Sequence, residues 1–253
     1  MRKIYAIGIG AGDPEQLTVQ AVDRLNRVDV FFVLDKGEEK ADLVRLREQI
    51  LDRYVTRPYR VVLVADPPRD RKPADYRAAV ADWHAARAEV YESVILSSLA
   101  ASQTGAFLVW GDPSLYDSTI ALIETVLARG RVTFEYEVIP GISSISALVA
   151  RHRTTMNQIG RAVQLTTGRL LASGWPPDVD DVFVLLDAHT TFDRYTSLDL
   201  TIYWGAYVGT PNEILISGPL TPALATEIRE TRAKARERHG WIMDTYLLRR
   251  PTP

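Results

Sequence analysis

The pattern that most constrains this chain is an alternation of short β-branched or aromatic runs with segments of helical periodicity. The runs predict buried strands at residues 3–9, 28–34, 59–65 and 106–110. The helical patterns predict helices at residues 15–27, 41–53, 74–101 and 114–128. This order of strands and helices predicts an α/β fold with a parallel sheet.

The pattern restarts after Gly130, where a glycine suits the left-handed cap of the preceding helix. Further strands are predicted at residues 132–138, 162–167, 181–186, 201–208, 213–217 and 241–247, with a long polar helix at 222–238. Repeated Tyr, Trp and Ile in this half favour a mixed, partly antiparallel sheet. We therefore expect two α/β domains, residues 1–130 and 131–253.

Composition limits the classes of function. The 253 residues are 46% hydrophobic and 25% charged, which is typical of a soluble globular protein. The chain has neither an apolar run of roughly 20 residues nor a signal-peptide pattern, so we expect a cytoplasmic protein without a membrane partner. A net charge of -2 does not indicate a nucleic-acid partner. Cysteine is absent and the histidines lack ligand spacing, so no metal site is expected.

The first chemical signal is a glycine-rich loop between the first strand and the first helix, Gly8-Ile9-Gly10-Ala11-Gly12-Asp13-Pro14. Glycines permit positive φ and let a ligand lie against bare backbone, and the following helix N-terminus favours an anionic group. A dinucleotide fingerprint would have a third glycine where this loop has Asp13, which disfavours a nicotinamide enzyme. A tight turn without a ligand is the alternative interpretation of the loop by itself.

Two more loops follow predicted strands, namely Trp110-Gly111-Asp112-Pro113-Ser114-Leu115-Tyr116 and Ile139-Pro140-Gly141-Ile142-Ser143-Ser144. Loops at the carboxyl ends of parallel strands share one edge of the sheet, where open α/β sheets bind ligands. A serine-hydrolase elbow would require glycine at the position of Ile145, so the serines are not predicted to be nucleophiles. They suit ligand binding at a helix start, or they simply cap the helix.

In order and spacing, these loops and the later Thr167-Gly168-Arg169 resemble the tetrapyrrole methylase family, and the likeness continues through residues 206–221. The resemblance implies a class III methyltransferase fold, a homodimer, and S-adenosylmethionine bound in the cleft between two α/β domains. It implies cofactor contacts at Pro14, Gly111, Asp112, Leu115, Tyr116, Ser143, Ser144, Leu186, Asp187, Ala206, Tyr207 and Thr221. Many relatives have methionine where this chain has Leu186.

Finer details resemble the family members that act on a precorrin in aerobic cobalamin biosynthesis; they lie at residues 33–37, 66–71, 107–119 and 165–169. This likeness implies methylation of ring carbon 1 of precorrin-5 with release of acetate, and S-adenosylhomocysteine as the cofactor product. Because a sulfonium is already a strong electrophile, the protein mainly has to align donor and acceptor, which can lower a barrier by about 7–11 kcal/mol. Neither a metal nor a covalent nucleophile is required.

Loss of acetate adds a need for a group that accepts a proton from the attacking water. The candidates are Asp35, Asp112 and His152, with Lys36 as a charge stabiliser. Asp35 and Lys36 could instead form a solvated turn, and His152 could serve only the dipole of its helix.

A precorrin carries many carboxylates, which arginines bind efficiently through paired hydrogen bonds. The candidates for substrate binding are Gly10, Gly12, Arg69, Arg71, Trp110, Arg151 and Arg153. Trp110 could stack on the macrocycle or belong to the core. The basic residues of the helix at 222–238, Arg232 among them, are expected on a solvated face.

Other functions stay open at this point. A methylase of the same fold could act on another precorrin, a protein histidine or ribosomal RNA, although RNA would favour a more basic surface. A nicotinamide oxidoreductase and a non-catalytic tetrapyrrole carrier are the remaining alternatives. Binding of tetrapyrrole without methyl transfer would identify a carrier.

Overall fold

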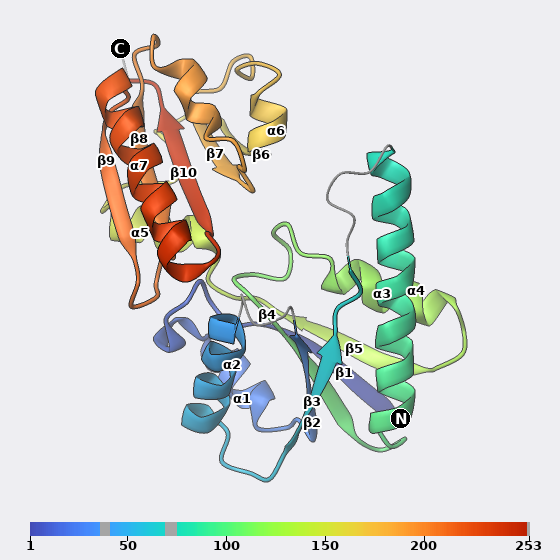
Figure 1. The fold of residues 1–253 in the computed structure, drawn as a ribbon. Helices are drawn as coiled ribbons and strands as arrows, with labels where there is room; N and C mark the ends of the chain where they lie inside the picture. Colours follow the sequence, from blue (N-terminus) through green and yellow to red (C-terminus); the bar gives the residue numbers. More distant parts are fainter. Residues whose placement is uncertain (36–40, 69–74, 252–253) are drawn as a thin grey trace. The chain divides into compact units, whose positions relative to one another are not determined.

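The computed structural model describes residues 1–35, 41–68 and 75–251. They form two compact units, one made of residues 1–10 and 14–142 and the other of residues 11–13 and 143–253. Each unit contains one sheet, and both sheets are drawn in Figure 1. The predicted pair of α/β domains, with a parallel sheet first and a mixed sheet second, is confirmed.

The first unit is built on a five-stranded parallel sheet in the order β3-β2-β4-β1-β5. Its strands are β1 (Arg2–Gly8), β2 (Val30–Asp35), β3 (Arg60–Ala65), β4 (Thr104–Val109) and β5 (Phe134–Ile139). Its helices are α1 (Val19–Leu25), α2 (Ala41–Tyr54), α3 (Tyr76–Ser98) and α4 (Thr119–Ala128), with a short 3-10 helix η1 (Pro14–Gln16).

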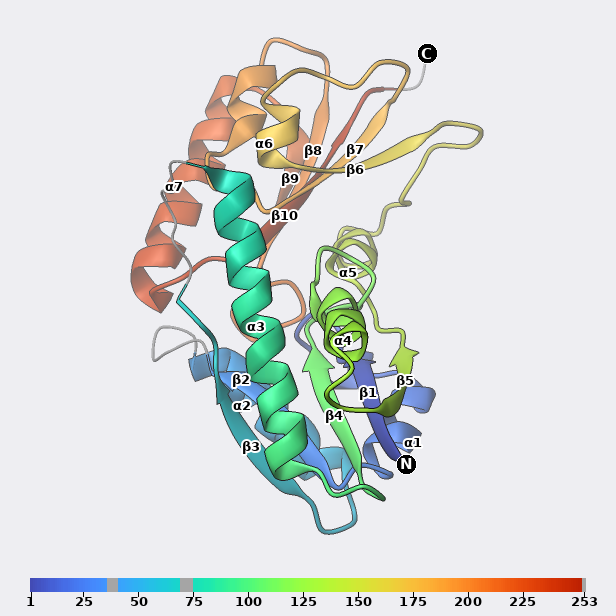
Figure 2. The ribbon, with the colours of Figure 1, turned by 90° about the vertical axis from the view of Figure 1, so that its right-hand side faces the viewer.

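Helices cover both faces of this sheet. Successive residues of a strand point to opposite faces, so Ile4 and Ala6 of β1 join the core under α3 and α4. Tyr5 and Ile7 join the core under α1 and α2. Figure 1 shows the two helical layers, and Figure 2 shows α3 running along its face of the sheet beside α4. Burial on both faces explains why the central strands β1, β2 and β4 are mostly apolar rather than alternating, whereas the edge strands β3 and β5 are more exposed.

The last strand of the first unit corrects the domain boundary. The sequence pattern assigns residues 132–138 to the second domain, yet β5 pairs in parallel with β1, with Lys3 opposite Glu135. The two units divide after Ile142, so the boundary follows β5 and does not lie at Gly130. Local periodicity identifies a strand but not its partner, and here the free edge of β1 provides that partner.

The starts of two helices also differ from the sequence pattern. α1 begins after Thr18, whose hydroxyl accepts a hydrogen bond from the Ala21 amide at 3.0 Å. α4 begins at Thr119 rather than near Ser114, because the loop after β4 extends through Ser118. No helix in the described ranges is long and apolar enough to cross a membrane.

The second unit is built on a mixed five-stranded sheet in the order β6-β7-β10-β8-β9, in which β6 and β7 are parallel and the other neighbours antiparallel. Its strands are β6 (Val163–Thr167), β7 (Asp181–Leu185), β8 (Thr201–Ala206), β9 (Ile214–Pro219) and β10 (Asp244–Arg249). Its helices are α5 (Ser144–Arg151), α6 (Gly168–Leu171), η3 (Thr191–Tyr195) and α7 (Pro222–His239).

The second sheet also has a buried layer on each face. Trp204 of β8 and Tyr246 of β10 lie in the core formed with η3 and with Ile228 of α7. On the other face α5 contacts β8 and β10, and Leu148 lies so close to Gly205 that a Cβ there would be 2.7 Å from its Cδ1.

Candidate functional site

Three glycine-containing loops follow neighbouring strands of the first sheet. β4, β1 and β5 lie side by side in parallel, so the chain leaves all three at the same edge. The connections from β1 and β4 run in opposite directions, which makes this edge a topological switch point. The first two loops are joined there, because the Gly111 amide donates to the Gly10 carbonyl at 2.8 Å. The predicted gathering of the loops at one edge is confirmed.

The glycines of these loops are required by contacts within the chain itself. A Cβ on Gly8 would lie 2.6 Å from the Gly141 nitrogen, and one on Gly141 would overlap the Gly111 carbonyl oxygen. Gly10 has a φ of 81°, and a Cβ on it would lie 2.7 Å from the Cβ of Gln16. A Cβ on Gly12 would be 2.5 Å from the Thr210 methyl group. Close packing against backbone at Gly8 and Gly141, and against side chains at Gly10 and Gly12, therefore accounts for these glycines without a ligand.

Asp112 ties the second loop to the third. Its Oδ2 accepts a hydrogen bond from the Gly141 amide at 2.9 Å, and its Oδ1 accepts one from the Ser114 amide at 2.8 Å and from the Ser114 hydroxyl. Burial acts to raise the pKa of Asp112, but the hydrogen bonds from Ser114 and Gly141 outweigh it and hold the pKa below its usual value. A carboxylate so engaged is a weak base, which argues for a role in loop geometry rather than in proton transfer.

The loop after β4 presents an aromatic side chain from a strained backbone. Tyr116 has a left-handed φ of 50°, and 46% of its surface is exposed. Leu115 and Pro14 are half-buried. Trp110 packs partly against the core under α1 and α2, and its buried Nε1 has no hydrogen-bond partner among the described residues. An exposed tyrosine held in an unfavourable conformation is a candidate for ligand contact.

The serines of the third loop begin a helix. The Ser143 hydroxyl caps α5 by accepting a hydrogen bond from the Ser146 amide at 3.2 Å, and it lies 3.0 Å from the Ser146 hydroxyl. Ser144 is the first residue of α5 and is half-buried. The capping alternative is therefore confirmed for Ser143, and contact of either serine with a cofactor stays a prediction.

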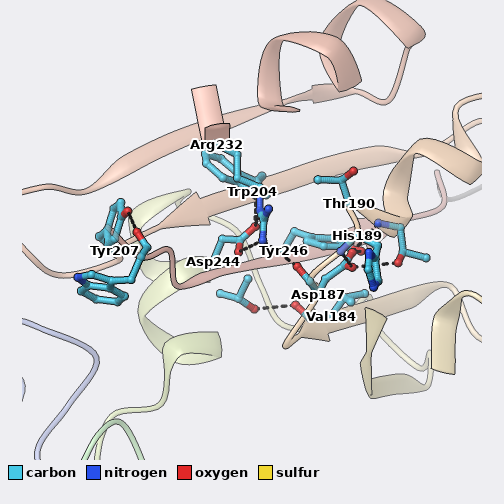
Figure 3. Close-up of polar contacts among 12 residues, drawn as sticks. Val184, Asp187, His189, Thr190, Trp204, Tyr207, Arg232, Asp244 and Tyr246 are labelled. Carbon is cyan, nitrogen blue, oxygen red and sulfur yellow. Dashed lines mark hydrogen bonds and ion pairs between the residues drawn. The ribbon is translucent and has the colours of Figure 1, made fainter. Parts of the chain in front are cut away.

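The turn after β7 combines a strained leucine with a buried aspartate. Leu186 has a φ of 53° and is 68% exposed. This conformation costs a leucine about 1–2 kcal/mol, so its surroundings must hold it in place. Asp187 is 5% exposed, and its carboxylate accepts hydrogen bonds from the Thr191 amide at 2.6 Å, the Thr191 hydroxyl at 3.0 Å, the His189 amide at 2.9 Å and the Tyr246 hydroxyl at 2.7 Å (Figure 3).

The Asp187 carboxylate also explains a glycine of the sequence pattern. A Cβ on Gly168 would overlap this carboxylate, and the Thr191 hydroxyl, whose single proton is shared with the Asp187 carboxylate, lies 3.2 Å from the Gly168 carbonyl. Burial, together with the neighbouring Asp187, raises the pKa of Tyr246 well above its usual value, so the phenol stays a donor. The side chain of Asp187 is thus fully engaged in hydrogen bonds within the protein. The predicted cofactor contact of Asp187 therefore has to be made by its backbone.

The remaining predicted cofactor residues have side chains engaged within the second unit. Tyr207 is buried with a φ of 49°, and its hydroxyl donates to the Trp241 carbonyl at 2.5 Å. Ala206 is buried at the end of β8. The Thr221 hydroxyl caps α7 by accepting from the Leu224 amide at 3.2 Å. Their contact with a cofactor stays a prediction.

His152 follows α5 and is half-buried. Its Nε2 lies 3.0 Å from the Trp204 carbonyl, and a carbonyl can only accept, so Nε2 carries a proton. Burial lowers the pKa of His152, and the Trp204 hydrogen bond opposes that shift in part. The neutral ring therefore has its lone pair on Nδ1, which makes His152 chemically suited to accept a proton.

Two predicted substrate arginines lie near the end of α5. Arg151 is paired with Glu213, with 2.6 Å between Nε and Oε1, and Glu213 also accepts from the Gly209 amide at 2.8 Å. Arg153 is exposed and has a φ of 54°. Arg151 is thus already braced by a carboxylate, and binding of a substrate carboxylate by either arginine stays a prediction.

The chain matches a model of one protein family over residues 3–223, that of the Tetrapyrrole (Corrin/Porphyrin) Methylases. It is 49% identical over 251 residues, covering 99% of this chain and 96% of the relative, to precorrin-6A synthase [deacetylating] from a Sinorhizobium species. The chain belongs to the tetrapyrrole methylase family. A second relative from Sinorhizobium, precorrin-2 C(20)-methyltransferase, is 32% identical over 145 residues, 57% of this chain and 55% of the relative.

Similar solved structures have the same fold. A cobalamin-synthesis-related protein, CobF, of Corynebacterium diphtheriae is 37% identical with a TM-score of 0.85, covering 98% of both chains. The cobalt precorrin-4 methyltransferase CbiF has a TM-score of 0.66 at 16% identity, over 97% of this chain and 94% of that one. A uroporphyrin-III C-methyltransferase of Thermus thermophilus, solved with S-adenosylhomocysteine, has a TM-score of 0.59 at 19% identity, over 97% and 96%. The class III methyltransferase fold is thereby established for this methylase.

Some predicted site residues cannot be placed in the methylase. Lys36, Arg69 and Arg71 lie outside the described residues, and of Asp35 only the backbone, at the end of β2, is described. Within the described part of the chain, no group of three or more His, Asp or Glu side chains is placed to hold a metal ion.

The sequence interpretation missed Arg232, which it assigns to a solvated face of the helix at 222–238. Its side chain is 12% exposed and is paired with Asp244 at 2.9 Å. The missed signal is the spacing, because Arg232 falls in register with the buried residues Ala225, Ile228 and Ala235 of α7. A charged residue within a buried helical stripe predicts a buried partner rather than solvent.

Proposed function

We propose that this methylase transfers a methyl group from S-adenosylmethionine to ring carbon 1 of precorrin-5 and releases acetate, giving precorrin-6A. The observation that carries the proposal is the 49% identity, over almost the full length of both chains, to precorrin-6A synthase [deacetylating]. The partial likeness to precorrin-2 C(20)-methyltransferase covers little more than half of either chain and supports the family rather than that substrate.

The exposed side chains at two strand ends suit the uncharged parts of an adenosyl ligand. Tyr116 and Leu186 each present apolar surface from a left-handed turn, one after β4 and one after β7. With them we propose backbone groups of Asp187 and Tyr207 as cofactor contacts. The remaining proposed contacts are Pro14, Gly111, Asp112, Leu115, Ser143, Ser144, Ala206 and Thr221. S-adenosylmethionine supplies an activated methyl group when bound, and these residues orient it toward the acceptor carbon.

Release of acetate assigns a second task to the protein. Ring carbon 1 donates the electron pair of its new bond to the methyl carbon, and the pair of the broken carbon–sulfur bond stays on sulfur. Water adds to the acyl carbonyl, the carbon–carbon bond to the macrocycle breaks with its electron pair left on the macrocycle, and acetate departs. We propose His152 or Asp35 as acceptor of the water proton, because Asp112 is held as a weak base by its hydrogen bonds.

Substrate carboxylates call for cationic partners. We propose that four arginines bind these carboxylates, namely Arg151, Arg153, Arg69 and Arg71. Lys36 is the proposed charge stabiliser, and Trp110 is proposed to stack on the macrocycle. Gly10 and Gly12 of the first loop are the remaining proposed substrate contacts. We further propose that the methylase is cytoplasmic and that, as the family resemblance implies, it forms a homodimer.

The proposal is tested by incubating the purified protein with precorrin-5 and methyl-labelled S-adenosylmethionine, and following label in the tetrapyrrole and free acetate together. We expect equal amounts of transferred label and acetate. Label transfer without acetate would retain the methylase and exclude the deacetylating step. Neither product, in protein that binds S-adenosylhomocysteine, would favour another precorrin or a carrier.

A further inference from the structure

The residue that follows the exposed Leu186, Asp187, is held by polar contacts to both its side chain and its main chain. The carboxylate of Asp187 is fixed by Thr191, His189 and Tyr246. The carbonyl of Asp187 accepts a hydrogen bond from Nη2 of Arg232 at 2.9 Å. Side chain and main chain of the residue after Leu186 are therefore both anchored, and the anchors come from η3, β10 and α7 (Figure 3).

Arg232 reaches the Asp187 carbonyl from a fixed position. Its Nε lies 2.9 Å and its Nη2 3.3 Å from the two oxygens of Asp244, so the guanidinium plane is set by a two-point contact. Asp244 also accepts from the Trp204 indole at 3.1 Å. An arginine can hold a carboxylate and a carbonyl together through its rigid fork, whereas the single ammonium of lysine cannot reproduce this geometry.

We propose that Arg232 is a positioning residue for the cofactor, acting through the Asp187 carbonyl to keep Leu186 in its left-handed, exposed conformation. The inference rests on the proposed function, in which Leu186 contacts S-adenosylmethionine. Without these contacts, Leu186 would relax toward an extended backbone conformation, and its side chain would move away from its present position. Arg232 thus affects cofactor binding without touching the cofactor.

A purely structural role for Arg232 makes a different prediction from positioning. Loss of a structural ion pair lowers stability and the fraction of active protein, which appears in kcat, while the affinity of each folded molecule is unchanged. Loss of positioning raises the dissociation constant of S-adenosylhomocysteine and the KM for S-adenosylmethionine, with the KM for the tetrapyrrole unaffected.

The test compares Arg232→Lys with Arg229→Lys by calorimetric titration of S-adenosylhomocysteine into the full chain, with thermal unfolding recorded on the same samples. Arg229 is the matched control, because it lies on α7 one turn earlier and its ion pair, 3.3 Å to Asp193, does not involve Asp187. We expect Arg232→Lys to weaken binding about tenfold and Arg229→Lys to leave it within about twofold.

A second pair of variants tests whether Arg232 acts on cofactor binding through the conformation of Leu186. Glycine adopts positive φ without strain. In a Leu186→Gly background the turn therefore no longer needs the Arg232 hydrogen bond to keep its conformation. We expect Arg232→Lys to change affinity by less than about twofold in that background, compared with about tenfold in the parent chain. Asp244→Asn, which removes the charge that orients Arg232, should act in the same direction and serves if Arg232→Lys does not fold.

The outcomes separate the two proposals. Equal affinity of the parent and Arg232→Lys would overturn positioning, and so would an undiminished effect in the Leu186→Gly background. A parent chain that fails to bind S-adenosylhomocysteine would overturn the proposed cofactor before any variant is compared. Weakened binding that disappears with Leu186→Gly would establish the positioning role.

Discussion

The Asp112 carboxylate accepts a hydrogen bond from the Gly141 amide at 2.9 Å, which connects the loop after β4 to the loop after β5. These loops flank the loop after β1, so one side chain fixes the spacing of the edge at which the three gather. The same carboxylate accepts from the Ser114 amide, so it also sets the local turn of its own loop.

Asp112→Ala should therefore reduce stability. The variant leaves the Gly141 and Ser114 amides without their acceptor, and we expect the free energy of unfolding to fall by about 1–3 kcal/mol. Urea unfolding of the full chain measures the change, and Asp82→Ala, on the exposed side of α3, provides a control that should stay within about 0.5 kcal/mol. An effect no larger than that of the control would contradict a connecting role.

Asp112 should also contribute to the pH dependence of stability. Its pKa is lowered in the folded chain, so the folded state binds this proton less readily than the unfolded state. Its stabilising contribution is complete above the unfolded value of about 4 and is lost as the pH falls through the folded pKa. The difference in unfolding free energy between the parent and Asp112→Ala should shrink on acidification, and a constant difference would exclude this linkage.

Gly141→Ala should reduce stability far more than Gly130→Ala, because Gly130 has open surroundings. A Cβ on Gly141 would overlap the Gly111 carbonyl and the Gly8 backbone, whereas Gly130 has nothing within 4 Å. We expect Gly141→Ala to lower stability by about 3 kcal/mol or more, because backbone rather than a flexible side chain has to move. Gly130→Ala incurs only the strain of its positive φ, about 1–2 kcal/mol. Similar melting temperatures for both would argue against the close packing.

Leu186→Ala should weaken cofactor binding while leaving stability almost unchanged. The side chain is 68% exposed, so its loss should change unfolding free energy by less than about 0.5 kcal/mol. If it contacts the cofactor, the dissociation constant of S-adenosylhomocysteine should rise several-fold. Leu63→Ala on β3 is the control, since Leu63 is similarly exposed, at 63%, and lies outside the predicted site. Equal affinities of the two variants would remove Leu186 from the site.

His152→Gln tests the proton acceptor. The lowered pKa of His152 keeps the ring neutral at pH 7, so acetate release in the parent should decline as the pH falls through that pKa. We expect the variant to release acetate about 100-fold more slowly while binding S-adenosylhomocysteine normally. The matched control is His84→Gln on α3. An unchanged rate would leave Asp35 as the proposed acceptor.

Much of this protein follows from its sequence. The alternating strand and helix patterns specify two α/β units, because side-chain periodicity directly reflects which faces are buried. The three glycine loops are identifiable because glycine, aspartate and proline have strong local conformational preferences. Their gathering at one edge also follows, since parallel strands end on the same side of a sheet.

Only the tertiary structure shows which strands pair and which residues contact one another. Periodicity marks residues 132–138 as a strand but does not show that this strand pairs with β1, so the domain boundary could not be predicted from local patterns. The neighbours that require glycine at positions 8 and 141 come from distant loops. The spacing of Arg232 on α7 marks it as buried, but only the structure shows that its partners are Asp244 and the Asp187 carbonyl. The physical reason is that hydrogen bonds and close packing depend on positions in space, whereas propensity and periodicity depend only on neighbours along the chain.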